Sequence, residues 1–140
     1  MQINTLTPDY AVAGQILPED ATALKAAGFA AVICNRPDGE VYGDEASAAI
    51  RAAVEAAGLS FTYNPVVNGA MTADNVAAQG SAIAQSPGPV FAYCRSGMRS
   101  AFVWALSQSG TLPTDDLITA AARGGYDLSG LRPQIEAAAR

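Results

Sequence analysis

The order of predicted elements places this chain in the α/β class, with a mainly parallel central sheet of about four to five strands flanked by helices. Two observations carry this prediction. Up to about residue 110, short apolar runs of strand length alternate with alanine-rich segments of helical length. Beyond that point there is no strand pattern, which predicts an all-helical C-terminal tail. No linker interrupts the series, so residues 1–140 are expected to form a single domain.

Each expected element follows from a local pattern. Apolar runs predict strands at about residues 10–15, 29–34, 59–67 and 90–93. Helices are predicted at about 18–27, 44–57 and 72–85, after Arg99 to about 109, and in the tail from 113 and from 131. Proline and acidic residues favour the first turn of the helix at 18–20, and Thr72 has a side chain suited to a helix cap.

The composition excludes several classes of catalyst and partner. The chain has no histidine, which removes imidazole bases, Ser-His-Asp triads and His-ligated zinc. Two cysteines are too few for a disulfide framework or a four-cysteine metal site, so we expect neither metal nor cofactor. A net charge of −5 argues against a nucleic-acid partner, and short apolar runs argue against a membrane. Because the first ten residues lack the pattern of a secretory signal, we expect a cytoplasmic protein with reduced thiols.

One segment combines an apolar strand, a cysteine, a glycine, an arginine and a helix start, and we call residues 94–100 the reactive loop. The end of a parallel strand places Cys94 at the crevice where open α/β sheets bind ligands. Backbone N–H groups of the loop, together with the positive end of the following helix, form a cradle for an anion. We therefore predict Cys94 as a thiolate nucleophile assisted by Arg99. The anion-binding loop is predicted to comprise Arg95, Ser96, Gly97, Met98 and Ser100.

A simpler interpretation treats these residues as structural. A cysteine at a strand end is commonly a small buried hydrophobe, and two arginines four residues apart can simply be exposed on the surface of a helix. However, positive charge is unfavourable at a helix N-terminus. Arg95 and Arg99 in an acidic chain therefore indicate a bound anion.

The spacing of the loop separates two chemistries. Cysteine-dependent phosphatases place five residues between cysteine and arginine, whereas only four separate Cys94 from Arg99, and Ser100 stands where the phosphatase arginine belongs. The pattern C-x-x-G-x-R resembles the active loop of rhodaneses, which carry sulfur as a cysteine persulfide. The shorter ring is expected to suit a single sulfane sulfur better than a phosphoryl group.

The rest of the chain resembles one family over essentially its whole length. The stretches are AVICNRPDGE at 31–40, YNPVV at 63–67, YCRSGMRS at 93–100, GYDL at 125–128 and LRP at 131–133. They look like the bacterial beta-lactamase-hydrolase-like protein, phosphatase-like domain family. The resemblance implies the three-layer fold of dual-specificity phosphatases, together with sulfur transfer in sulfide or persulfide metabolism. Met98 departs from similar sequences, which often carry threonine there, and so removes a hydroxyl from the cradle.

Three residues outside the loop are candidates for a supporting role. Arg36 and Asp38 follow the strand that ends at Cys34, so they reach the same sheet edge as Cys94 if the two strands adjoin. Arg36 would then bind an anionic substrate and Asp38 would orient an arginine, although a solvated turn explains both equally well. Cys34 is either a core residue or a partner that resolves a persulfide or forms a disulfide with Cys94.

The general acid that a phosphatase requires has no obvious source. The resemblance to dual-specificity phosphatases implies that the acid would lie within residues 64–71, but this segment contains no carboxylate. The nearest carboxylate, Asp74, belongs to the start of a predicted helix. The sequence therefore predicts a sulfurtransferase that passes sulfur from thiosulfate or a persulfide donor through Cys94 to a thiol acceptor, such as glutathione or a protein cysteine. The alternatives are a cysteine-dependent phosphatase and a non-catalytic anion-binding or redox-sensing module.

Overall fold

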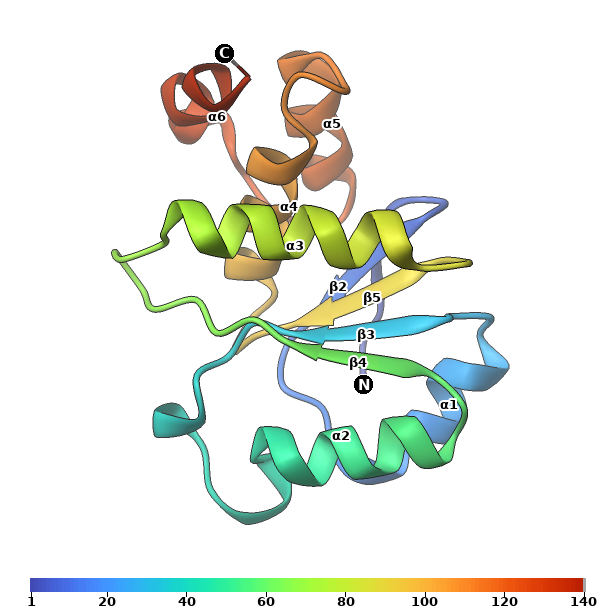
Figure 1. Cartoon of the computed structure of the whole chain (residues 1–140). Coiled ribbons are helices and arrows are strands. Elements are labelled where there is room, and N and C mark those ends of the chain that lie inside the picture. Colours follow the sequence, from blue (N-terminus) through green and yellow to red (C-terminus); the bar gives the residue numbers. More distant parts are fainter. Residues whose placement is uncertain (140) are drawn as a thin grey trace.

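The computed structural model describes residues 1–139, and in it helices cover both faces of a five-stranded sheet (Figure 1). Its strands are β1 (Asn4–Thr7), β2 (Tyr10–Ala13), β3 (Ala31–Cys34), β4 (Ser60–Tyr63) and β5 (Val90–Tyr93). They lie in the order β1-β2-β5-β3-β4, and only the edge strand β1 pairs antiparallel with its neighbour. The predicted α/β class and mainly parallel sheet are confirmed. β1 was not predicted, because in its sequence NTLT only Leu6 is buried.

The helices form the two outer layers. They are α1 (Ala21–Ala26), α2 (Ser47–Ala56), α3 (Ala73–Gln85), α4 (Met98–Gln108), α5 (Thr114–Arg123) and α6 (Arg132–Ala138). In Figure 1, α1 and α2 lie on one side of the sheet and α3 to α6 on the other, so the predicted helical tail is present. The Thr72 hydroxyl caps α3 by accepting the Asn75 N–H at 3.1 Å. The end of the terminal helix predicted at 140 lies outside the described residues.

The sheet has a hydrophobic core on each face, and successive side chains of a strand point alternately into one core and the other. In β3, Ala31 and Ile33 join the core beneath α4 and α5, whereas Val32 and Cys34 join the core beneath α1 and α2. Residues buried on both faces explain why these strands read as continuous apolar runs rather than alternating ones. None of the helices within residues 1–139 is long and apolar enough to cross a membrane.

The register of the sheet brings four loops to one edge. The last residues of the parallel strands are paired in rows: Ala13 with Tyr93, Tyr93 with Cys34, and Cys34 with Tyr63. The chain segments that follow these residues therefore leave the sheet side by side. Among them are the reactive loop, the 3-10 turn Asp38–Glu40 and the segment before α3.

Candidate active site

Cys94 follows directly after β5 and is buried, with 1% of its surface exposed. Its backbone N–H donates to the Ala13 carbonyl at 3.3 Å, which ties the loop to β2. Its sulfur accepts a hydrogen bond from the Gly97 N–H at 3.1 Å. The loop therefore curls back over the sulfur and directs a backbone donor at it, as the sequence predicts for an anion cradle.

Gly97 makes this curl possible. Its φ of 99° lies in the left-handed region that favours glycine. A Cβ at this position would also collide with the Tyr126 hydroxyl. That hydroxyl donates to the Ser96 carbonyl at 2.8 Å and accepts from the Asn4 amide at 2.9 Å. Tyr126, which lies in the stretch GYDL but was given no functional role from the sequence, thus holds the outer wall of the reactive loop.

The remaining loop side chains lie in different environments. Arg95 and Ser96 are exposed, and the Ser96 hydroxyl accepts the Met98 N–H at 3.3 Å. Gly14 faces the loop from the end of β2, where a Cβ would lie 2.8 Å from the Arg95 carbonyl oxygen. Met98 is half-buried and opens α4, two residues earlier than the helix predicted after Arg99.

Arg99 is buried in the first turn of α4 and is held by a carboxylate. Its two terminal nitrogens donate to the two oxygens of Glu40, each at 2.8 Å, and one of them also donates to the Val66 carbonyl at 2.8 Å. The bond to Arg99 holds the pKa of Glu40 below its usual value, and the same bond raises the pKa of Arg99. The sequence predicts that Arg99 binds an anion, and in the structure that anion is the Glu40 carboxylate of the chain itself.

Arg36 lies beside this pair, whereas Asp38 serves another purpose. The Arg36 guanidinium donates to Glu40 at 3.3 Å and to Gln15 at 3.2 Å, so Glu40 bridges two arginines. Asp38 accepts the backbone N–H and the hydroxyl of Ser47 at 2.8 and 2.7 Å and thereby fixes the start of α2. The arginine-orienting role expected of Asp38 is filled in the structure by Glu40, which the sequence analysis missed.

Ser100 turns away from the loop into a buried polar network. Its hydroxyl donates to Asn35 at 2.9 Å, and its carbonyl accepts the Tyr10 hydroxyl at 2.9 Å. At the centre of the network, the Gln79 amide oxygen accepts from Asn35 at 2.8 Å and from Asn64 at 2.9 Å. These bonds join the start of α4, the ends of β3 and β4, and α3. Ser100 therefore anchors the reactive loop from behind, and its hydroxyl is not aimed at the cradle.

Cys34 lies in the core beneath α1 and α2, and its thiol donates to the Arg36 carbonyl at 3.3 Å. Burial raises the pKa of this thiol. Both cysteines are free. Within residues 1–139 no three His, Cys, Asp or Glu side chains are grouped so as to hold a metal ion.

A family profile described as "Beta-lactamase hydrolase-like protein, phosphatase-like domain" matches residues 2–111. This chain belongs to that family. A beta-lactamase hydrolase-like protein from Agrobacterium fabrum is 32% identical over 127 residues, which cover 89% of this chain and 30% of the relative. Beta-lactamase hydrolase-like proteins from Xylella fastidiosa are 30% identical over 91% of this chain. The phosphatase-like chain thus spans less than a third of the length of these relatives.

Solved structures agree with the family assignment. A provisionally assigned phosphatase from Neisseria meningitidis superposes with a TM-score of 0.84 at 30% identity and covers 99% of both chains. PTPMT1 superposes with a TM-score of 0.71 at 15% identity, covering 97% of both chains, and so shows the fold alone. The predicted resemblance and the dual-specificity-phosphatase-like fold are confirmed. The chemistry favoured by these comparisons is that of a cysteine-based phosphatase-like enzyme, and none of them shows sulfur transfer.

Proposed function

We propose that this phosphatase-like domain is a cysteine-dependent phosphatase in which Cys94 attacks the phosphorus of a phosphorylated anion. The observation that carries the proposal is the Gly97 N–H aimed at the Cys94 sulfur at 3.1 Å, at the N-terminus of α4. A backbone donor and a helix dipole stabilise negative charge at that point. The family and the related fold favour phosphoryl transfer as the chemistry that uses it.

The reaction would proceed in two displacements. The Cys94 thiolate forms a bond to phosphorus, the phosphorus–oxygen bond breaks, and the leaving group departs with the electron pair. Water then attacks the cysteinyl phosphate, releasing inorganic phosphate and restoring the thiolate. Arg99 would stabilise the equatorial oxygens, so the substrate must share it with Glu40 or displace that carboxylate.

The surroundings of the loop indicate which phosphates are suitable. Residues 64–71 carry no carboxylate, Asp38 is bonded to Ser47, and Glu40 is paired with Arg99. A leaving group would therefore depart without an acid to protonate it. Aryl phosphates and phosphoanhydrides, whose leaving groups are stable as anions, are the expected substrates, and simple alkyl phosphates should react slowly.

The test compares wild-type protein with Cys94→Ser. Wild type should hydrolyse p-nitrophenyl phosphate, and rapid quenching should trap one phosphoryl group on Cys94 by mass spectrometry. The serine variant should lose both while keeping its thermal unfolding midpoint. Phosphatase turnover that survives in Cys94→Ser would contradict the assignment of the nucleophile.

A specific observation keeps sulfur transfer as a second candidate: only four residues separate Cys94 from Arg99. In this reaction the thiolate attacks the outer sulfur of thiosulfate, the sulfur–sulfur bond breaks, and sulfite leaves. A thiol acceptor then removes the sulfur from the Cys94 persulfide. Thiosulfate treatment followed by intact-mass measurement should add one sulfur to wild type but none to Cys94→Ser. A protein that forms neither adduct is better described as a binding or redox-sensing module.

A further inference from the structure

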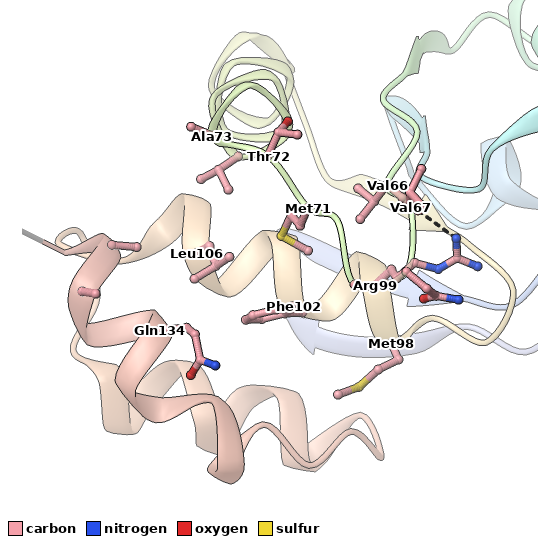
Figure 2. A pocket seen from close by; sticks show the side chains of 15 residues that line it. Val66, Val67, Met71, Thr72, Ala73, Met98, Arg99, Phe102, Leu106 and Gln134 are labelled. Carbon is pink, nitrogen blue, oxygen red and sulfur yellow. Dashed lines mark hydrogen bonds between the residues drawn. The ribbon is translucent and has the colours of Figure 1, made fainter.

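A cavity of about 620 Å³ opens next to the reactive loop. It lies between the segment that leads into α3, one face of α4 and one face of α6, and Figure 2 shows side chains from all three elements converging on it. We call it the α4 groove. Its volume falls within the ~300–1,000 Å³ range typical of small-molecule sites.

The lining of the groove is mostly apolar and carries no carboxylate. Met71, Met98, Phe102 and Leu106 project into it, and the amide of Gln134 lies across from them on α6 (Figure 2). Methionine and aromatic side chains adapt to apolar groups of varied shape. The groove therefore suits the neutral, hydrocarbon part of a ligand.

The groove is continuous with the reactive loop through two residues. Met98 belongs to the loop by its backbone and lines the groove with its side chain. Arg99 lines the groove as well, while its guanidinium is bonded to Glu40 and to the Val66 carbonyl, which is part of the groove wall. A ligand whose anionic group reaches the loop can thus extend its remaining atoms along α4.

We propose that the α4 groove binds the hydrocarbon portion of the substrate, so that the enzyme acts on amphiphilic anions rather than on small hydrophilic phosphates. This inference rests on the proposed function, because the anionic head is placed at the reactive loop. Small side chains at Gly69, Ala73 and Ala137 leave the groove open, and a larger side chain at one of these positions would close it.

The test uses a ligand series with a constant head and a growing tail. Ethyl, butyl and octyl phosphate, each below its micelle concentration, are titrated by calorimetry into Cys94→Ser, which cannot turn them over. Each buried methylene improves affinity by ~threefold in favourable cases. Octyl phosphate should therefore bind at least about tenfold more tightly than ethyl phosphate.

A filled groove separates this effect from non-specific binding. Adding Ala137→Phe should bring the octyl-to-ethyl ratio close to one and leave ethyl phosphate affinity unchanged. Ala122→Phe, at an exposed position on α5 outside the groove, is the matched control and should keep the full ratio. Ethyl phosphate that binds with no gain from a longer tail, or a gain that survives Ala137→Phe, overturns the groove proposal alone. Failure of all three phosphates to bind overturns the proposed phosphatase function together with it.

Discussion

Glu40 is the single residue that most changes the interpretation of the reactive loop. It accepts two 2.8 Å hydrogen bonds from Arg99 and one of 3.3 Å from Arg36. Arg99 is largely buried while Glu40 is partly exposed, so the pair is shielded from solvent on the arginine side and open to it on the carboxylate side. A resident carboxylate therefore both aims the Arg99 guanidinium and competes with any incoming anion for it.

Replacing Glu40 should separate these two effects. Glu40→Gln removes the competing charge, so inorganic phosphate should bind about threefold more tightly, the size of a partly screened Coulomb interaction. Turnover of p-nitrophenyl phosphate should fall, because Arg99 loses its charged partner and its fixed orientation. Calorimetry gives the phosphate affinity. Glu136→Gln, which alters an exposed pair with Arg132, serves as a control and should change neither quantity.

The same ion pair predicts a pH dependence of stability. Because the hydrogen bond from Arg99 lowers the pKa of Glu40 in the folded protein, the ionised carboxylate stabilises the fold at pH values above its ordinary pKa of 4.5. That contribution is lost as the pH falls from there through the lowered value. The difference in unfolding midpoint between wild type and Glu40→Gln should thus stay constant above about pH 5.5 and shrink below pH 4.5. A difference independent of pH down to 3 would show that the pair contributes no net stability.

At the scale of elements, the junction between β5 and α4 depends on one backbone conformation. Gly97 combines a positive φ with a side chain position already occupied by the Tyr126 hydroxyl. Gly97→Ala should cost ~1–3 kcal/mol of stability and abolish turnover, since the N–H to the Cys94 sulfur moves with the loop. Chemical denaturation measures the loss. Adding Tyr126→Phe should recover part of it by removing the hydroxyl, the nearest of the clashing atoms, whereas Gly130→Ala, with open space around it, should be nearly neutral.

Helix α3 is tied to the sheet by a buried amide rather than by apolar contacts alone. Gln79 is fully buried and makes four hydrogen bonds, two accepted from Asn35 and Asn64 and two donated to Tyr10 and Asn35. Gln79→Leu would remove all four of these bonds from a buried network, so we expect a loss of ~2–4 kcal/mol in the free energy of unfolding. Gln85→Leu at the exposed end of the same helix should change it by less than ~0.5 kcal/mol. Equal effects of the two substitutions would contradict a structural role for the network.

The elements were predictable from the sequence wherever the determinant was local. The cap at Thr72, the apolar run of β5 and the left-handed Gly97 are each properties of a few adjacent residues. The partner of Arg99 was not predictable in this way. Glu40 lies 59 positions away and meets Arg99 only because β3 and β5 are neighbours in the sheet. The place of Asp38 in the turn after Cys34 suggested that residue instead, and Asp38 is bonded to Ser47.

At the scale of the whole molecule, the sheet divides the interior into two cores and separates the two cysteines. Cys34 is paired with Tyr93 in the sheet and shares its face, toward α1 and α2. The next residues, Asn35 and Cys94, follow these two at the strand ends, and the Asn35 side chain reaches the α3 side to contact Gln79. Because side chains alternate along extended chain, the register directs Cys94 away from the core that holds Cys34.

This division predicts that oxidation stops at Cys94. Mild peroxide should convert Cys94 to a sulfenic acid and then to higher oxyacids. Cys34 should remain a thiol, since burial raises its pKa and so disfavours the thiolate that would attack the sulfenic acid. Non-reducing peptide mapping distinguishes the products, and Cys34→Ala should give the same yield of Cys94 oxyacids as wild type. A Cys34–Cys94 disulfide in wild type, with faster overoxidation of Cys94 in Cys34→Ala, would instead mean that the strand ends open enough for the two sulfurs to meet across the sheet.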